Sequence, residues 1–198
     1  MTDLAGKYAV VTGASQGIGQ SIAAALYDAG VGLVLLGRSR ERLEASIGYI
    51  SSAAETPTPR LVEADLLDTD SLEAAAEEIV ADLPTVDILI NCGGAYLRGE
   101  WDGPNPDIFS SLMTANVVGP YALTRLLLPK LVEASGDVVF VNSSIVRSQG
   151  TGASHYKATQ HALQAVSDSL RSEFNDRGVR VLSIHPGRTA TPRQEYIY

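Results

Sequence analysis

A glycine-rich turn near the start of the chain is the first feature that could do chemistry. It follows the apolar run Tyr8–Val11, opens an Ala- and Ile-rich stretch, and reads Thr12-Gly13-Ala14-Ser15-Gln16-Gly17-Ile18-Gly19. Strand, glycine turn and helix in this order bring main-chain N–H groups close to a pyrophosphate at the positive N-terminus of a helix. The turn therefore predicts dinucleotide binding. Glycine turns that serve only steric needs remain the alternative.

Basic residues follow the second apolar run, which ends Leu36-Gly37-Arg38-Ser39-Arg40. An acidic residue at this distance from the glycine turn would bind the ribose diol of NAD. Gly37 stands there instead, and a guanidinium next to it can bind a 2′-phosphate through paired hydrogen bonds. Arg38, Ser39 and Arg40, with Ser15 on the facing turn, therefore favour NADP over NAD. The alternative is a solvated basic helix start, which the helix dipole disfavours.

Six apolar runs of strand length alternate with five helical stretches. Because the runs are almost continuously apolar, we expect both faces of a sheet to be covered. The alternation implies right-handed crossovers and a parallel sheet, whose carboxyl edge binds ligands. We predict an α/β fold with a three-layer, doubly wound parallel sheet, the Rossmann fold. The expected strands are Tyr8–Val11, Val31–Leu36, Arg60–Val62, Val86–Ile90, Val138–Val141 and Val179–Ile184, and the expected helices are Gly17–Asp28, Ser39–Ser51, Ser71–Ala81, Asp107–Glu133 and Ser154–Asn175, the fourth kinked by Pro120.

Composition limits the class of protein. The chain has 198 residues, and we expect a single domain over residues 1–198. A net charge of −8 argues against a nucleic-acid partner, and no apolar run is long enough to span a bilayer. The single cysteine, Cys92, suits a reducing cytoplasm, where we place the protein. No spacing of His, Cys and carboxylates predicts a metal site.

Further motifs fall where the predicted strands end. They are Asp65-Leu66, Asn91-Cys92-Gly93-Gly94, Asn116 in the long helix, Asn142-Ser143-Ser144, Tyr156, and His185-Pro186-Gly187-Arg188-Thr189-Ala190-Thr191. In this order, together with the glycine turn, they resemble the short-chain dehydrogenase/reductase family over essentially the whole chain. The resemblance implies a nicotinamide cofactor, and a carbonyl compound or secondary alcohol as substrate. It also implies a homodimer or homotetramer formed through the two longest helices.

The resemblance assigns residues to the cofactor. Asp65 and Leu66 would lie against the adenine, Asn91 and Gly93 along the central part, and the segment from Pro186 to Thr191 over the nicotinamide end. The expected cofactor-binding set is Gly13, Ser15, Gln16, Gly17, Ile18, Gly19, Arg38, Ser39, Arg40, Asp65, Leu66, Asn91, Gly93, Pro186, Gly187, Thr189 and Thr191.

The resemblance also assigns the catalytic residues Asn116, Ser143 and Tyr156, with Gln160 where the family has lysine. Tyr156 would be the general acid or base, Ser143 would hydrogen-bond the substrate oxygen, and Asn116 would position a water molecule. Gln160 can hydrogen-bond a ribose but carries no charge. An ammonium ~4 Å from a phenolate contributes about 4 kcal/mol at an effective dielectric of 20, so its loss leaves the pKa of Tyr156 nearer the reference value of about 10.

The departure at Gln160 keeps more than one function open. The first is an NADP(H)-dependent oxidoreductase whose turnover the glutamine impairs. The second is a dinucleotide-binding protein with little or no turnover, acting as a redox sensor or scaffold, and the third is a structural subunit. Lys157 is adjacent to Tyr156, but successive helical residues diverge by about 100°, so we expect a solvated lysine.

The chain also ends early relative to this pattern. It stops at Tyr198, seven residues after Thr191. The resemblance implies a substrate-covering lid, a helix and a final strand beyond that point, so we expect the last strand and the lid to be missing. Without those residues the substrate cannot be named.

Overall fold

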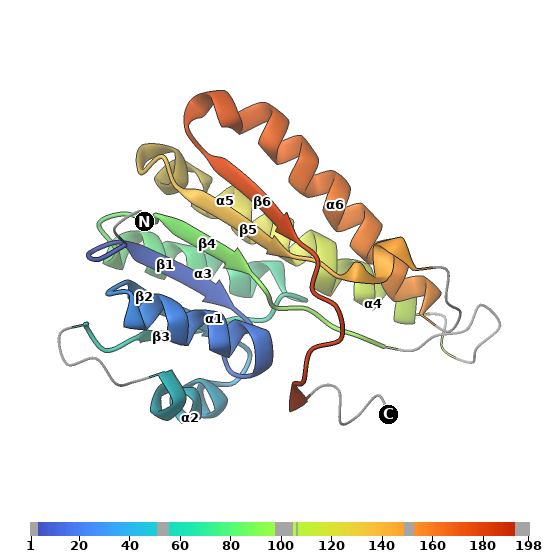
Figure 1. Ribbon diagram of the computed structural model, residues 1–198, viewed down its shortest axis with the longest axis horizontal. Helices are drawn as coiled ribbons and strands as arrows, with labels where there is room; N and C mark the ends of the chain where they lie inside the picture. Colours follow the sequence, from blue (N-terminus) through green and yellow to red (C-terminus); the bar gives the residue numbers. More distant parts are fainter. Residues whose placement is uncertain (1–3, 51–55, 98–104, 106, 149–152, 193–198) are drawn as a thin grey trace.

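Six parallel strands form one sheet in the order β3-β2-β1-β4-β5-β6 (Figure 1). The computed structural model describes residues 4–50, 56–97, 105, 107–148 and 153–192. The chain crosses from β3 at one edge to β4 in the middle, the arrangement of a doubly wound sheet. The strands are β1 Tyr8–Thr12, β2 Gly32–Gly37, β3 Arg60–Glu63, β4 Ile88–Asn91, β5 Asp137–Val141 and β6 Arg180–Ile184. The predicted Rossmann fold is confirmed.

Helices cover the sheet in two layers (Figure 1). Helices α1 and α2 pack on one face with Ala9, Val11, Leu33 and Leu35, and α3, α5 and α6 pack on the other with Val10, Val34, Leu36 and Val138. The strands β1, β2 and β4 are thus buried on both sides, which explains their continuous apolar sequences. Against expectation, β5 and β6 are fully buried on one face only, and Leu182 and Ile184 are exposed. The helices are α1 Gly17–Asp28, α2 Arg40–Ile50, α3 Thr69–Asp82, α4 Ile108–Met113, α5 Gly119–Glu133 and α6 Ser154–Phe174.

The single helix predicted over Asp107–Glu133 is interrupted. A π-helical turn, Thr114–Val118, separates α4 from α5. Pro120 at the start of α5 has no N–H, so the carbonyl of Asn116 cannot accept the usual α-helical hydrogen bond from residue 120. The chain widens into a π turn at this place, and such turns often occur at functional sites.

Two short 3-10 helices were not predicted from the sequence. One is Ser144–Arg147 directly after β5, and the other is Asn175–Arg177 before β6. The first lies at the carboxyl edge of the sheet and packs against α6. It therefore belongs to the surroundings of the candidate site.

Candidate active site

The glycine turn after β1 is tightly packed. Gly13 and Gly17 have φ values of +66° and +59°, a region that favours glycine. A Cβ atom on Gly19 would lie 2.4 Å from the carbonyl oxygen of Gly13, so any side chain there would force α1 away from the turn. Ser15 and Ile18 are half-buried and Gln16 is exposed. The turn leaves main-chain N–H groups at the N-terminus of α1, as an anion site requires.

Thr12 joins the ends of β1 and β4. Its hydroxyl donates to the carbonyl of Ile90 at 3.3 Å and accepts hydrogen bonds from the N–H groups of Cys92 and Gly93 at 3.0 and 2.8 Å. The sequence analysis did not assign Thr12 to the site. Its position as the first residue of the glycine turn could have identified it as a residue of the site.

The basic residues after β2 have different surroundings. Arg40 pairs with Glu44 at 3.3 Å, and its N–H donates to the carboxylate of Glu63 at 3.0 Å. The hydroxyl of Ser39 accepts from the N–H of Arg42 at 3.3 Å and so caps the start of α2. Arg38 is exposed and makes no hydrogen bond or ion pair within the part of the chain that the structure describes. Of the two arginines, Arg38 is therefore the one whose guanidinium has no partner among the described residues.

The residues after β3 and β4 lie close to one another. Asp65 accepts from the N–H of Leu67 at 3.0 Å, and a Cβ on Gly93 would lie 2.9 Å from the Leu66 side chain. Asn91 is buried and donates to the hydroxyl of Thr124 on α5 at 3.0 Å. Its Oδ1 atom is buried without a hydrogen-bond partner.

Asn116 lies in the π turn and is 3% exposed. Its Oδ1 accepts from the N–H of Ala95 at 2.7 Å, and its Nδ2 donates to the carbonyl of Ala95 at 2.9 Å and to the hydroxyl of Thr159 at 3.1 Å. The side chain therefore ties the segment after β4 to α6. The sequence analysis expected Asn116 near a water molecule and did not foresee this double contact with Ala95.

Ser143 caps the 3-10 helix that follows β5. Its hydroxyl accepts from the N–H of Ile145 at 3.2 Å, and its carbonyl lies 3.3 Å from Nδ1 of His185. The N–H of Ser144 donates to the carbonyl of Pro186 at 3.0 Å. The segment that begins at Ser143 and the loop after β6 are thus held together at the carboxyl edge.

Tyr156 lies in the first turn of α6 and is half-buried. Tyr96, which follows the Ala95 held by Asn116, packs edge-on against it with ring centroids 4.9 Å apart and planes inclined at 69°. Thr159 donates to the carbonyl of Tyr156 at 2.7 Å. Sequence reasoning missed Tyr96, since no motif marks it.

Gln160 is buried one turn after Tyr156, at 3% exposure. Its main-chain carbonyl accepts from Asn142 at 2.9 Å, and its Nε2 lies at 3.5 Å from the hydroxyl of Thr159. The Oε1 atom is buried with no partner. Either orientation of the carboxamide leaves one buried polar end without a close hydrogen bond.

Lys157 is half-buried, and its ammonium group donates to the carbonyl of Ser148. The sequence analysis expected a solvated side chain, and that expectation is wrong. The hydrogen bond directs the charge toward the segment after the 3-10 helix.

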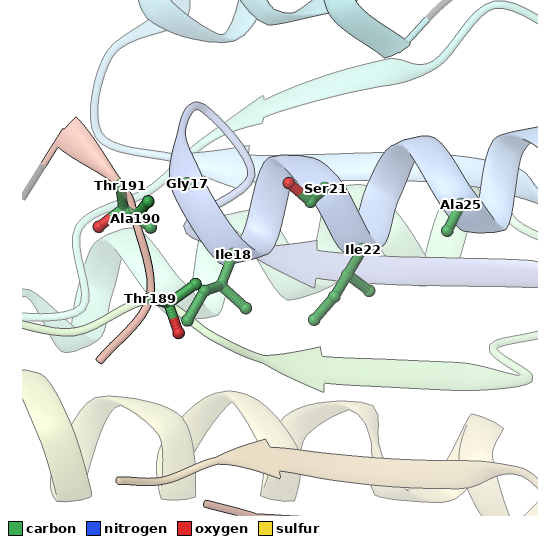
Figure 2. A pocket seen from close by; sticks show the side chains of 8 residues that line it. All are labelled: Gly17, Ile18, Ser21, Ile22, Ala25, Thr189, Ala190 and Thr191. Atoms are coloured by element: carbon green, nitrogen blue, oxygen red, sulfur yellow. The ribbon is translucent and has the colours of Figure 1, made fainter. Parts of the chain in front are cut away.

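The segment after β6 returns to the glycine turn. Thr189, Ala190 and Thr191 line a pocket of about 330 Å³ whose other wall is the start of α1 (Figure 2). A Cβ on Gly17 would lie 3.2 Å from the methyl group of Thr191. Four of the predicted cofactor residues therefore meet here, namely Gly17, Ile18, Thr189 and Thr191.

Hydrogen-bonded polar side chains connect His185, after β6, with Asp168 on α6. Nε2 of His185 lies 3.3 Å from the hydroxyl of Ser183, which donates to Gln164 at 3.2 Å. Gln164 donates to both carboxylate oxygens of Asp168 at 3.0 Å. The hydrogen bond from Gln164, followed by that from Arg171, lowers the pKa of Asp168.

The described residues contain neither a membrane-spanning helix nor a cluster of metal-binding side chains. No helix among them is long and apolar enough to cross a membrane, and no group of three or more His, Cys, Asp or Glu side chains could hold a metal ion.

Comparison with known proteins decides the family. A family model described as short chain dehydrogenase matches residues 7–198. The chain belongs to the short chain dehydrogenase family. The fold and the order of the site motifs agree with this membership.

The curated relatives of this chain are longer than the chain itself. It is 38% identical over 181 residues to dehydrogenase/reductase SDR family member 7B of Mus musculus, covering 90% of this chain and 56% of the relative. It is 33% identical over 191 residues to dehydrogenase/reductase SDR family protein 7-like of Drosophila melanogaster, covering 95% of this chain and 59% of that protein. The chain thus spans less than two thirds of these relatives.

Solved structures share the whole fold. A short chain dehydrogenase of Shigella flexneri 2a, described as complexed with NADP, superposes with a TM-score of 0.89 at 30% identity, covering 100% of this chain and 84% of that one. The Pseudomonas aeruginosa RhlG/NADP active-site complex has a TM-score of 0.91 at 26% identity, covering 98% of this chain and 77% of its own.

Proposed function

We propose that the protein is an NADP(H)-dependent oxidoreductase that transfers hydride between the nicotinamide and a carbonyl compound or secondary alcohol. The observation that carries this proposal is the meeting of the glycine turn with the segment after β6 around one pocket (Figure 2). These two segments are far apart in sequence and are the ones assigned to the pyrophosphate and to the nicotinamide end of the dinucleotide. Membership of an oxidoreductase family and the NADP complexes among the similar structures support it.

The residues present fit a dinucleotide. The turn of Gly13, Gly17 and Gly19 leaves main-chain donors open to a pyrophosphate, as a side chain at Gly19 would not allow. Oε1 of Gln160 and Oδ1 of Asn91 are buried acceptors without donors, and ribose hydroxyls are donors. An unsatisfied buried acceptor costs about 1–3 kcal/mol, so binding of a donor there is favoured. When bound, the nicotinamide supplies or accepts the hydride.

Arg38 is the residue we assign to the 2′-phosphate. Its exposed guanidinium has no internal partner in the described chain, whereas Arg40 is paired with Glu44. Glu63 is hydrogen-bonded to the N–H of Arg40, so a carboxylate also stands near this helix start. Preference for NADP over NAD therefore rests mainly on Arg38.

The proton is handled by Tyr156, with Ser143 holding the substrate oxygen. Lys157 does not replace the family's lysine, because its ammonium group is hydrogen-bonded to the carbonyl of Ser148. Gln160 can position a ribose hydroxyl but cannot stabilise a phenolate by charge. We therefore propose a slow enzyme whose oxidation reaction needs alkaline pH.

A second candidate function has one observation in its favour. Gln160 removes the charge on which the tyrosine chemistry of the family depends, so the protein could bind the dinucleotide with little turnover. Asn116, Ser143 and Tyr156 still occupy their expected elements, which favours the enzyme.

We also propose assembly into a homodimer or homotetramer in the cytoplasm. Val118, the last residue of the π turn, and Tyr121, in the first turn of α5, are 47% and 53% exposed. Apolar side chains on the longest helices are suited to a symmetric contact.

Cofactor titration with a product assay tests the proposal. Quenching of protein fluorescence by NADPH and NADH gives the two affinities, and incubation with ketones and aldehydes followed by mass spectrometry detects the alcohols. We expect tighter binding of NADPH and slow formation of at least one alcohol. Absence of binding by both cofactors would reject the proposal, and binding without product would favour the second function.

A further inference from the structure

Two aromatic contacts bracket the first turn of α6. Tyr96 packs edge-on against Tyr156, with ring centroids 4.9 Å apart. Phe109 of α4 packs against His155, with ring centroids 5.6 Å apart and planes inclined at 57°. Figure 1 shows α4 beside the beginning of α6, so both contacts lie at the same end of that helix.

Tyr96 is held in place by its neighbour in the chain. Both the N–H and the carbonyl of Ala95 are hydrogen-bonded to the buried side chain of Asn116, at 2.7 and 2.9 Å. A Cβ on Gly94 would lie 2.7 Å from Oδ1 of Asn116, so the chain before Ala95 also passes close to that amide. The main chain leading to Tyr96 is therefore fixed relative to α6.

The side chains next to these rings are apolar and accessible. Leu97 is 45% exposed and Phe109 is 42% exposed, whereas Tyr96 is half-buried. The ammonium group of Lys157, which directly follows Tyr156 in the chain, donates a hydrogen bond to the carbonyl of Ser148. An accessible apolar side chain thus directly follows Tyr96 in the chain, and sites for small ligands are lined mainly by apolar side chains.

We propose that Tyr96 is a specificity-determining residue that selects carbonyl substrates bearing a flat aromatic group. This proposal rests on the proposed function, because it names the substrate class of the same site. The carbonyl carbon of such a substrate lies near Tyr156, and its ring packs against Tyr96. The hydroxyl of Tyr96 has no part in the selection.

Aromatic pairs in offset or edge-to-face geometry are favoured over contacts of equal area with an aliphatic group. The preference corresponds to about a 2- to 10-fold difference in affinity per pair. A ring of the substrate therefore gains where a saturated ring of similar size does not.

The test compares acetophenone with cyclohexyl methyl ketone, which differ only in saturation of the ring. Dissociation constants are measured by ligand-observed NMR on the protein with NADP⁺ present, and KM and kcat are measured with NADPH. Four proteins are compared: wild type, Tyr96→Phe, Tyr96→Leu, and Tyr49→Leu as a control at an exposed tyrosine on α2.

We expect wild type, Tyr96→Phe and Tyr49→Leu to bind acetophenone several-fold more tightly than the saturated ketone, and Tyr96→Leu to bind both alike. In Tyr96→Leu the change should fall on KM for acetophenone, with NADPH affinity unchanged. Equal binding of both ketones by wild type, no detectable binding of either, or a preference that survives in Tyr96→Leu would overturn the proposal. Selective binding of acetophenone without turnover would retain it and reject the proposed reaction.

Discussion

The side chain of Asn142 donates a 2.9 Å hydrogen bond to the main-chain carbonyl of Gln160. Asn142 directly follows β5 and Gln160 lies in α6, so this bond fixes the helix against the sheet at the position where we propose that glutamine replaces the family's lysine. The carboxamide of Gln160 is buried beside Thr159 with its oxygen unpartnered. The hydrogen bond from Asn142 thus positions this turn of α6 in the proposed active site, but the neutral side chain of Gln160 supplies no positive charge.

Restoring that charge should increase the rate. In Gln160→Lys, an ammonium near Tyr156 lowers the pKa of the phenol and makes it a better proton donor at neutral pH. We expect hydride transfer to a ketone at pH 7 to rise on the order of 10-fold, and the pH midpoint of alcohol oxidation to fall by about one to two pH units. Stopped-flow NADPH fluorescence across the pH range measures both.

Gln160→Met is the matched control, since it fills the same buried space without a charge. It should show no gain in rate and should bind NADPH more weakly, because the carboxamide is gone. A Gln160→Lys protein that folds, binds NADPH and turns over no faster than wild type would show that the tyrosine does not limit the reaction.

Cofactor preference should depend on Arg38 more than on Arg40. Arg38→Ala removes an uncommitted guanidinium, so the affinity for NADPH should fall about 10-fold or more while that for NADH stays the same. Arg40→Ala should have a smaller effect, because its guanidinium pairs with Glu44. Fluorescence titration with both cofactors checks this, and a larger loss in Arg40→Ala would reverse the assignment.

Two glycines allow a paired test of the glycine turn. Gly19→Ala places a Cβ 2.4 Å from the carbonyl oxygen of Gly13, so α1 must shift and NADPH affinity should fall sharply. Gly48→Ala in the exposed part of α2 meets no atom within 4 Å and should raise the free energy of unfolding by about 0.5–1 kcal/mol. Denaturant unfolding and NADPH titration of both variants provide the comparison. A Gly19→Ala protein with wild-type affinity would argue against pyrophosphate binding at this turn.

Asp168 should contribute stability that depends on pH. Its hydrogen bonds from Gln164 and Arg171 hold its pKa below the usual 3.8, so its contribution is present above that pH and is lost as the pH falls through the folded-state pKa. Its side chain is 51% exposed, so Asp168→Asn should cost less than about 1 kcal/mol at pH 7. The difference between variant and wild type should vanish in strong acid. A difference that persists there, in urea unfolding curves, would assign it to packing.

Much of the fold follows from local sequence patterns. The apolar runs around Val10, Leu35 and Leu89 are buried on both faces, so their lack of alternation identified a covered parallel sheet. The long helix was predicted as one piece with a kink at Pro120, whereas the structure has a π turn just before the proline, and the spacing of the residues does not reveal that turn.

The site was predictable only where a motif marks it. Gly17 and Thr191, which two separate motifs assign to the cofactor, line one pocket. The contacts of Asn116 with Ala95, of Tyr96 with Tyr156, and of Lys157 with Ser148 join segments through side-chain directions that only the folded chain sets. Because sequence spacing does not reveal these directions, it predicted a solvated Lys157.

The central claim, hydride transfer with Tyr156 as the proton donor, is tested most directly by single-turnover oxidation of bound NADPH. Wild type and Tyr156→Phe are each mixed with a panel of ketones and aldehydes from about pH 6 to about pH 10, and NADPH fluorescence is followed. We predict that wild type and Tyr156→Phe bind NADPH with equal affinity and that wild type loses fluorescence with at least one carbonyl compound. The rate in Tyr156→Phe should be at least about 100-fold lower than in wild type. NADPH that binds but never loses its hydride, or a Tyr156→Phe protein as fast as wild type, would contradict the claim.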